Sequence, residues 1–550
     1  NNVIYALGST TTLATYNNGI IISNNKIRDM FRAAAATNGI LIATGNSDWT
    51  ISGNSIYQTA SRTYTTAANH TGINVSSSTD NNMSITNNYI GGNTVNAGGT
   101  ATIMTGAVNN RYRGISLTVG TTTASSVQGN TIANFDFTSS TGSTTVGGPW
   151  CGIYVSAGPV NIGTVTGNTI GAATGNGSVL STITTATSGV SSGIFIDGGT
   201  LHNIANNIIG SVNTVGTAAL AHGFTGIHVA TSTVSVTVNG NTIGSTSTSN
   251  SINASFATTG TTAPVVTGIL QASGAAVAIT NNTVANLNNN YAPAAVNAGA
   301  FIRGIYASSG IDSIAGNTVR NLSVSGNGNG TGNNASVTGI SNFSSTPGNN
   351  YIRANTIHSL TNSNVSAACY VTGIFYNGPT TGGIIDRNLV YGLTTPSSIG
   401  LVNGINAGGQ TAIYRNNMIR LGIDASGAST VTATNFNGIL ETAGNNSFLH
   451  NTVYIGGTGV NTSPATSTYA FYNNALLTGT RVIRNNIFIN ERTSASTGGK
   501  HYAIRIGGTT VSPTGLTINN NIYRAPVGAF ENVLGFYNSA DVTTLGAWQA

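Results

Sequence analysis

One short pattern recurs along the whole chain. It is an apolar residue, any residue, a third residue that is usually Gly or Asn, then Asn, any residue and a second apolar residue, as in residues 51–56 (Ile-Ser-Gly-Asn-Ser-Ile) and residues 165–170 (Val-Thr-Gly-Asn-Thr-Ile). The fourth-position asparagines are Asn25, Asn54, Asn88, Asn130, Asn168, Asn207, Asn241, Asn282, Asn317, Asn355, Asn388, Asn417, Asn451, Asn486 and Asn521. Their fourteen intervals cover 496 residues, so one copy recurs about every 35 residues. This periodicity predicts a solenoid of stacked coils.

The chemistry of the six positions explains the pattern. The two apolar residues are expected to point inward from two short strands. The third position is Gly or Asn in twelve of the fifteen copies, and these residues tolerate the left-handed conformation of a tight corner. The Asn that follows can bond to the same Asn of the next coil, which predicts an internal asparagine ladder. A surface turn would also accept Asp or Ser there, and none of the fifteen copies has either.

A second pattern, Gly-Ile-x-apolar, precedes the ladder asparagines by 13–16 residues, as in Gly39-Ile40 and Gly438-Ile439. We interpret it as a further strand, entered through a glycine corner. Each coil then holds three strands, and polar stretches of variable length, such as residues 171–190, form protruding loops. The sequence therefore predicts an all-β chain, a single right-handed parallel β-helix over residues 1–550 with about fifteen coils and long polar loops.

The rhythm of these two patterns resembles the pectin-lyase-like right-handed β-helix repeat over nearly the whole chain. The last residues, 519–523 (Asn-Asn-Asn-Ile-Tyr) and 545–550 (Leu-Gly-Ala-Trp-Gln-Ala), are similar to a passage of large secreted β-helix proteins of the Bacteroidota. Such proteins usually continue into a sorting domain for type IX secretion. The resemblance implies an exported protein of which this chain is a fragment, with residues 525–550 as the start of a C-terminal extension.

Enzymes with this kind of fold carry clustered carboxylates, whereas the twelve acidic residues here are scattered. They are Asp29, Asp48, Asp80, Asp136, Asp197, Asp312, Asp386, Asp424, Asp541, Glu441, Glu491 and Glu531. Glycoside hydrolysis needs two carboxylates about 5–10 Å apart. Of these residues, Asp386 comes nearest to having a partner, but its neighbours are cations. The seven His and two Cys form no metal-ligand spacing. The sequence therefore predicts no enzyme, no metal and no cofactor.

The charged residues also argue against nucleic acid as a partner. Eighteen Lys and Arg against twelve acids give a net charge of +6, and no cation lies between Arg113 and Arg303. Nucleic-acid binding would need a dense basic stripe. No stretch approaches the roughly 18 apolar residues of a transmembrane span. Cys151 and Cys369 fall six coils apart, about 29 Å at the usual strand spacing, so we expect two buried free thiols.

Two outward-facing features remain. Arg353, Asp386 and Arg415 stand two positions before successive ladder asparagines and predict an alternating charge ladder on the surface. The residue after the Gly-Ile pair gives a candidate contact stripe of aromatic and aliphatic side chains: Tyr154, Phe195, His228, Leu270, Tyr306 and Phe375. Loops of the same chain, another subunit, or stacked sugars could cover this stripe.

These observations favour an extracellular or cell-surface structural protein that associates with copies of itself into a fibre or surface layer. Low charge weakens the repulsion between copies, and neither end of the sequence shows a capping helix, which leaves end-to-end stacking open. An adhesin or glycan-binding β-helix is the alternative, and a polysaccharide lyase or hydrolase is a third possibility.

Overall fold

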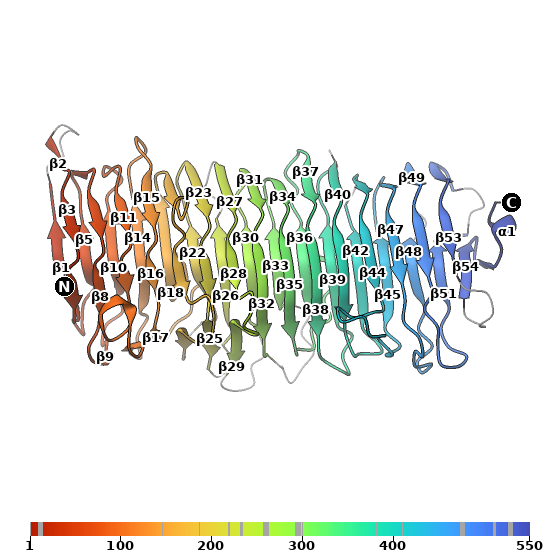
Figure 1. Cartoon of the computed structure of the whole chain (residues 1–550), viewed down its shortest axis with the longest axis horizontal. Helices are drawn as coiled ribbons and strands as arrows, with labels where there is room; N and C mark the ends of the chain where they lie inside the picture. The colour runs from red at the N-terminus through yellow and green to blue at the C-terminus, as the bar shows by residue number, and fades with distance from the viewer. Residues whose placement is uncertain are drawn as a thin grey trace. The chain divides into compact units, whose positions relative to one another are not determined.

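The computed structural model of the chain describes residues 2–8, 15–145, 147–185, 187–217, 220–230, 235–256, 263–291, 299, 301–380, 382–409, 411–473, 479–509, 513–525 and 532–549. It divides into two compact units, the N-terminal unit (Asn1–Ala294) and the C-terminal unit (Ala295–Ala550). Within each unit, short parallel strands of successive coils lie side by side (Figure 1). Each unit is a parallel β-solenoid, which confirms the fold class predicted from the repeat. Its architecture is consistent with the pectin-lyase-like β-helix.

Each coil of the N-terminal unit contributes to three sheets, named here in chain order. The first sheet holds β1 (Asn2–Ala6), which lacks the Gly-Ile pair, and the Gly-Ile strands β5 (Thr37–Ile42), β10 (Asn69–Ser76), β14 (Arg111–Thr118), β18 (Trp150–Ala157), β22 (Gly189–Ile196), β26 (His222–Val229) and β30 (Val266–Gln271). The second sheet holds the strands before the ladder asparagines: β3 (Ile21–Ser23), β7 (Thr50–Ser52), β11 (Ser84–Thr86), β15 (Ser125–Gln128), β19 (Val160–Ile162), β23 (Leu201–Ala205), β27 (Ser235–Asn239) and β31 (Ala276–Thr280).

The third sheet of this unit follows the ladder asparagines, and in most coils it is made of two short strands. Those next to the ladder are β4 (Lys26–Arg28), β8 (Ser55–Tyr57), β12 (Tyr89–Ile90), β16 (Thr131–Ile132), β20 (Thr169–Gly171), β24 (Ile208–Gly210), β28 (Thr242–Gly244) and β32 (Thr283–Asn289). Those further along the coil are β9 (Arg62–Thr63), β13 (Thr102–Thr105), β17 (Phe135–Ser139), β21 (Val179–Ile183), β25 (Val212–Gly216) and β29 (Ile252–Phe256). A small pair, β2 (Asn17–Asn18) and β6 (Asn46–Ser47), lies outside the three sheets.

The C-terminal unit repeats the arrangement with one strand per sheet in each coil. Its first sheet holds β33 (Ile302–Ala307), β36 (Val337–Asn342), β39 (Tyr370–Tyr376), β42 (Leu401–Ala407), β45 (Asn435–Glu441), β48 (Thr468–Asn473), β51 (His501–Arg505) and β54 (Asn532–Tyr537). The second holds β34 (Ile311–Ala315), β37 (Asn350–Arg353), β40 (Gly383–Asp386), β43 (Ile413–Arg415), β46 (Ser447–Leu449), β49 (Arg481–Arg484) and β52 (Leu516–Asn519). The third holds β35 (Thr318–Val324), β38 (Thr356–Asn362), β41 (Leu389–Thr394), β44 (Met418–Leu421), β47 (Thr452–Ile455), β50 (Ile487–Asn490) and β53 (Ile522–Arg524).

Rows of branched aliphatic side chains fill the interior of each solenoid. In the third sheet, Ile56 is paired with Ile90, and Ile90 with Ile132, and none of the three is more than 1% exposed. In the C-terminal unit, Ile340, Ile374 and Ile405 form the same kind of row in the first sheet, and each is 0% exposed. Each fully buried side chain of this size contributes about 1.5–3 kcal/mol. The inward orientation predicted for the apolar positions is thus confirmed for these rows.

The glycine of the Gly-Ile pattern lies inside a strand and not at a corner. Gly72 is in the middle of β10. A Cβ atom added to it would lie 2.6 Å from the carbonyl oxygen of Gly114 in the next coil and 2.8 Å from Cγ2 of Ile90 in the third sheet. The expectation of a glycine corner is therefore wrong. Close packing between the first and third sheets requires the missing side chain here.

In the copy of the ladder pattern at residues 165–170, the prediction for the first inward-facing apolar residue is wrong by three positions. Val165 is 85% exposed, and the inward residue is Ile162 at the end of β19, which is 0% exposed. The intervening residues form an outward bend, and Oε1 of Gln128 accepts a hydrogen bond from the Val165 amide at 3.0 Å. Because of this insertion, Val165 matches the pattern in the sequence although its side chain faces solvent.

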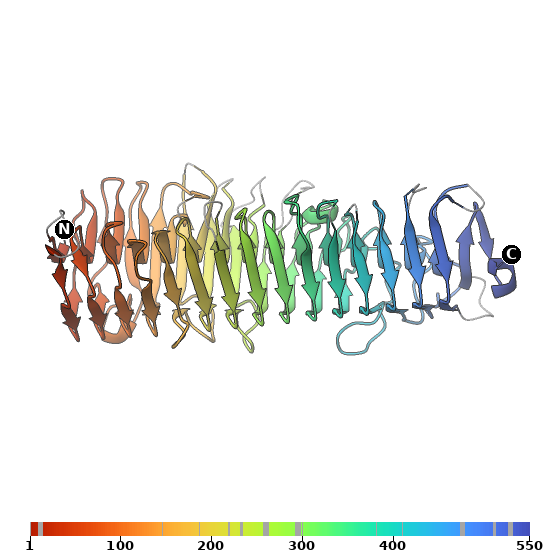
Figure 2. The same ribbon diagram turned by 90° about the horizontal axis from the view of Figure 1, so that it is seen from above.

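The last described coil of the C-terminal unit is covered. Strand β55 (Ala540–Val542) pairs antiparallel with β54, and helix α1 (Leu545–Gln549) follows it (Figure 2). The ring of Trp548 lies 5.7 Å from that of Tyr523 and 6.1 Å from that of Tyr537, measured between centroids. The expectation that no helix covers this end is wrong, because the five-residue α1 was not recognised from its sequence. Strand β54 pairs in parallel with β51, so residues 532–537 extend the first sheet.

Candidate functional site

The ladder asparagines form a continuous hydrogen-bonded row in each unit. From Asn25 to Asn282, and again from Asn317 to Asn521, each Nδ2 donates to Oδ1 of the next ladder Asn at 2.8–3.0 Å. The same Oδ1 also accepts the backbone amide of the preceding ladder Asn at 2.9–3.1 Å. Thirteen of the fifteen are at most 1% exposed, while Asn25 is exposed and Asn521 is half-buried.

The second hydrogen of each amide explains why Asp cannot replace Asn. Nδ2 of Asn241 donates to the carbonyl of Ile204 in the preceding coil at 2.9 Å as well as to Asn282. Oδ1 of Asn241 accepts two hydrogen bonds from Asn207. All four hydrogen-bonding positions of the side-chain amide are thus used. The asparagine ladder is confirmed, and its chemistry is structural.

The corner before the ladder is left-handed in fourteen of the fifteen copies, with Gly167 as the exception. This includes the three copies that lack Gly or Asn: Ala354 has φ of 52°, Arg387 of 55° and His450 of 57°. A left-handed residue other than Gly or Asn costs roughly 1–2 kcal/mol. The ladder therefore imposes the corner even where the local residue opposes it.

In the N-terminal unit, the candidate contact stripe lies on the outer face of the first sheet. Tyr154 is in register with Phe195, Phe195 with His228, and His228 with Leu270. Phe195 is 3% exposed and packs with Cys151, while Tyr154, His228 and Leu270 are half-buried. A Cβ atom added to Gly147 would lie 3.0 Å from Cβ of Cys151, so the chain before β18 lies over this cluster.

Polar partners fix the same cluster. Tyr154 donates a hydrogen bond to Oδ2 of Asp197 at 2.7 Å, and the guanidinium carbon of Arg113 lies 4.4 Å from the centre of the Tyr154 ring. Burial raises the pKa of the Cys151 thiol to about 12 and lowers the pKa of His228 to about 4. At neutral pH the thiol is therefore protonated and the imidazole neutral. Neither group is prepared for nucleophilic or acid–base chemistry.

In the C-terminal unit, Tyr306 and Phe375 are separated by Ser341 on the same outer face. Phe375 is 6% exposed, and its ring lies 3.2 Å from where a Cβ atom of Gly332 would be. Gly332 begins the 3-10 turn η3 (Gly332–Asn334), whose Asn334 accepts a 3.4 Å hydrogen bond from Arg303. Arg303 in turn lies 4.1 Å above the Tyr306 ring.

The predicted charge ladder is formed in part: Asp386 pairs with Arg415, whereas Arg353 lies over a tyrosine ring. Asp386 is in register with both Arg353 and Arg415. Its carboxylate lies 3.5 Å from Nε of Arg415 and 3.0 Å from Nε of Arg387, which is exposed at the corner. The guanidinium of Arg353 instead lies 4.5 Å from the centre of the Tyr351 ring. Asp386 is 4% exposed, so these cations also cover it from solvent.

Three buried acidic residues lie near the connection between the first and second sheets: Asp80 before β11, Asp312 in β34 and Glu441 at the end of β45. Asp80 is 0% exposed and accepts the backbone amides of Gly45 and Asn46 at 2.9 and 3.0 Å. Asp312 accepts a hydrogen bond from Asn342, and Glu441 accepts one from Asn473. Burial raises the pKa of Asp80 to about 6 and that of Glu441 to about 7. Each carboxylate therefore links neighbouring coils through hydrogen bonds near this connection.

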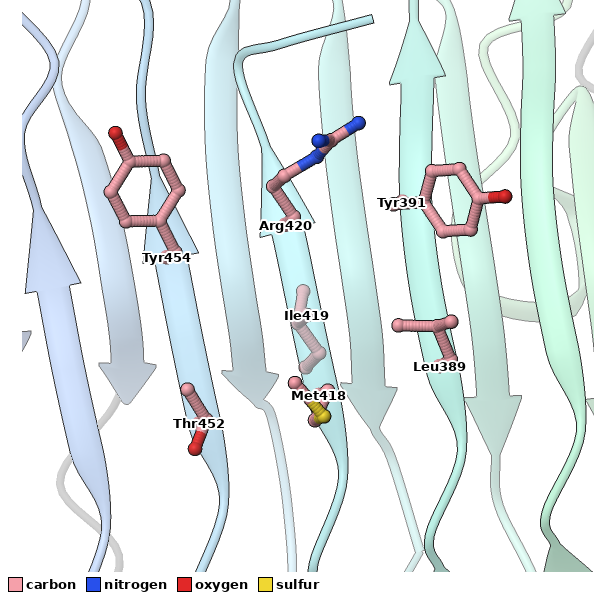
Figure 3. A pocket seen from close by; sticks show the side chains of 7 residues that line it. All are labelled: Leu389, Tyr391, Met418, Ile419, Arg420, Thr452 and Tyr454. Atoms are coloured by element: carbon pink, nitrogen blue, oxygen red, sulfur yellow. The ribbon is translucent and has the colours of Figure 1, made fainter. Parts of the chain in front are cut away.

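Sequence reasoning missed a groove on the outer face of the third sheet in the C-terminal unit. It has a volume of about 410 Å³ and is lined by Leu389, Tyr391, Met418, Ile419, Arg420, Thr452 and Tyr454 (Figure 3). Strands β41, β44 and β47 supply these residues in two rows. One row is Tyr391, Arg420 and Tyr454, and the other is Leu389, Met418 and Thr452.

The aromatic row of the groove is supported from one end. The ring of Tyr391 stacks on that of His358 in the neighbouring strand, with centroids 4.7 Å apart and planes inclined by 7°. Arg420 lies 5.4 Å from the centre of the Tyr391 ring, and its Nη2 donates to the carbonyl of Asp424 at 3.1 Å. Burial, and then the charge of Glu491, raises the pKa of Tyr454. Its phenol is therefore a neutral hydrogen-bond donor at neutral pH.

The other row exposes apolar surface. Leu389 is 38% exposed and Met418 is 57% exposed, although both are large hydrophobic side chains in a regular strand. A sequence signal for the groove did exist. The third residue after the ladder Asn is His358, Tyr391, Arg420 and Tyr454 in four successive coils, whereas it is Gly or Ala at the same position from Gly91 to Ala285.

Comparisons with protein-family models, with curated proteins and with solved structures find no match. Among the described residues, no three or more His, Cys, Asp or Glu side chains gather as metal ligands would. Cys151 and Cys369 are free and buried. None of the helices that the structure describes is long and apolar enough to cross a membrane.

Proposed function

We propose that this chain is an extracellular structural protein that associates with copies of itself into a fibre or surface layer. The observation that carries the proposal is the low charge of the outer surface of the solenoid. Charged residues are only 5% of the chain. Among the described residues, four acids outside the core are paired with cations of the same chain, in Asp29–Arg62, Asp386–Arg415, Glu491–Arg524 and Asp541–Lys500, and the pair Glu441–Arg481 is buried.

A nearly uncharged surface changes how identical molecules meet. Repulsion between copies is weak, and Asn, Thr and Ser side chains can form neutral hydrogen bonds that salt screens little. We propose that a repeated contact between copies generates the assembly.

The proposal includes an exported location, and the type IX route implied by residues 545–550 is part of it. An adhesin or glycan-binding role is the second candidate, and the exposed groove on the third sheet of the C-terminal unit favours it. A polysaccharide lyase or hydrolase is the third, and the buried, structurally engaged carboxylates Asp80, Asp312 and Glu441 give it no support.

The test is the assembly state of the purified chain, measured by sedimentation and electron microscopy at low and high salt. We expect filaments or sheets whose abundance changes little between about 0.01 and 1 M salt, the range over which screening of exposed charges changes most. A protein that stays monomeric at all concentrations and salt levels would contradict the proposal. Release of reducing ends or unsaturated products from a polysaccharide would contradict its non-enzymatic part.

A further inference from the structure

We propose that the groove formed by β41, β44 and β47 is a binding site for a glycan chain that lies across the strands. The inference does not depend on self-association, because it concerns side chains on one face of the C-terminal unit. It rests on the shape, the exposure and the charge of the residues that line the groove.

The tyrosines provide flat platforms. Figure 3 shows the rings of Tyr391 and Tyr454 face-on, one on each side of Arg420. Tyr391 rests on His358, so one face of its ring is occupied and the ring is held in place. The C–H-rich face of a pyranose ring packs well on an aromatic face held in this way, because both surfaces are apolar and flat.

Arg420 supplies the polar contact between the two platforms. Its Nη2 is held by the carbonyl of Asp424, and its stem lies beside Tyr391. Among the residues that line the groove Arg420 carries the only charge, so sugar hydroxyl, ring or carboxylate oxygens would find donors at its guanidinium, while the carboxylate of Glu491 lies beside Tyr454 at the far side.

The spacing suits a linear polymer. Tyr391 and Tyr454 are two strands apart in register, about 9.6 Å at the usual strand separation. A chain of sugar rings that crosses the strands can therefore place separate rings on the two tyrosines, with the exposed Leu389 and Met418 beside it. The volume of about 410 Å³ lies within the range of small-molecule sites.

The experiment uses the complete chain, a broad array of immobilised plant, bacterial and animal polysaccharides, and calorimetric titration of the best-bound oligosaccharide. We expect binding that Tyr391→Ala or Tyr454→Ala weakens at least tenfold and that Tyr391→Phe, which keeps the ring, changes less than threefold. Arg420→Ala should weaken neutral sugars moderately and uronate-containing sugars more strongly, which separates the two ligand types.

The matched control is Tyr351→Ala, which removes a tyrosine with its own arginine, Arg353, from the second sheet of the same unit. It should leave binding unchanged. Absence of binding across the array, or equal binding by wild type and Tyr391→Ala, overturns the proposal. If Tyr391→Ala and Tyr454→Ala instead abolish self-association seen by sedimentation while no sugar binds, the groove is a contact between copies and the glycan proposal is wrong.

Discussion

The third side of the coil is built differently in the two units. In the N-terminal unit it is broken into two short strands in six successive coils, such as β20 and β21, whereas in the C-terminal unit it is one strand, such as β41. In five of these six coils the third residue after the ladder Asn is Gly or Ala. At Gly171 and Gly244 an added Cβ atom would lie 1.9 and 1.8 Å from a carbonyl oxygen of the next coil, so no larger residue fits.

Where the strand continues, this position is free to carry a large side chain on the outer face. Tyr391, Arg420 and Tyr454 use that freedom and form the groove. This position does not decide the third side alone, because the coil of Tyr57 is also broken, into β8 and β9, and β32 continues through Ala285. The two units also differ at the corner before the ladder, where Ala354, Arg387 and His450 occur only in the C-terminal unit.

The largest expected effect tests what the units share. Asn241→Ala in the N-terminal unit and Asn417→Ala in the C-terminal unit each remove a buried amide whose four hydrogen-bonding positions are used. Each buried group left without a partner costs about 1–3 kcal/mol. Chemical denaturation should therefore show a loss of this size or more for both variants. Asn239→Ala, at a half-buried surface position, is the control. A loss of stability confined to one unit would contradict a shared role of the ladder in both units.

A smaller effect distinguishes the units by pH. The pKa of Asp80 rises from 3.8 to about 6 on folding, so the folded state binds more protons between those values and stability falls as pH rises through that window. For Glu441 the corresponding fall lies between 4.5 and about 7. Asp80→Asn should match wild type near pH 4 and exceed it by about 1–3 kcal/mol at pH 7. Asp80→Asn should still lose stability between pH 4.5 and about 7, because Glu441 is unchanged. If its stability depends on pH as that of the wild type does, Asp80 does not cause the fall between pH 3.8 and about 6.

The smallest effect concerns the corner. Ala354 is exposed and left-handed, so Ala354→Gly should stabilise the C-terminal unit by about 0.5–1 kcal/mol. Gly240→Ala introduces the same misfit into the N-terminal unit, where the new Cβ atom would lie 2.9 Å from Oδ1 of Asn206, and should destabilise it by about 1 kcal/mol. Thermal unfolding of both variants checks the pair. If both substitutions raise the stability, or both lower it, the inference of strain at the corner is wrong.

Much of the fold could be predicted because a solenoid repeats its chemistry. The fifteen ladder asparagines, their left-handed corners and the inward aliphatic rows all follow from one six-residue pattern, since each coil must satisfy the same contacts with the next. The predictions that are wrong concern a local insertion and the packing of one sheet against another across the core. Val165 fits the pattern by residue type but lies in an outward bend. Gly72 packs against the third sheet and does not form a turn.

The candidate site could be predicted only in part. The alternation of a strand places Tyr154, Phe195 and Phe375 on the outer face, but the segments that cover them come from loops without any periodic pattern. The groove at Tyr391 was missed because its residues lie in three coils and look unremarkable within any one of them.

The amino-acid sequence by itself determined the solenoid, the asparagine ladder and the low charge of the surface, because each depends on residue types at fixed spacing. The tertiary structure alone decided which outward side chains are covered and which stay open, that Asp80 and Glu441 are buried, and that Tyr391 stacks on His358. These properties depend on contacts between coils and loops far apart in the chain, and no local pattern of residues specifies them.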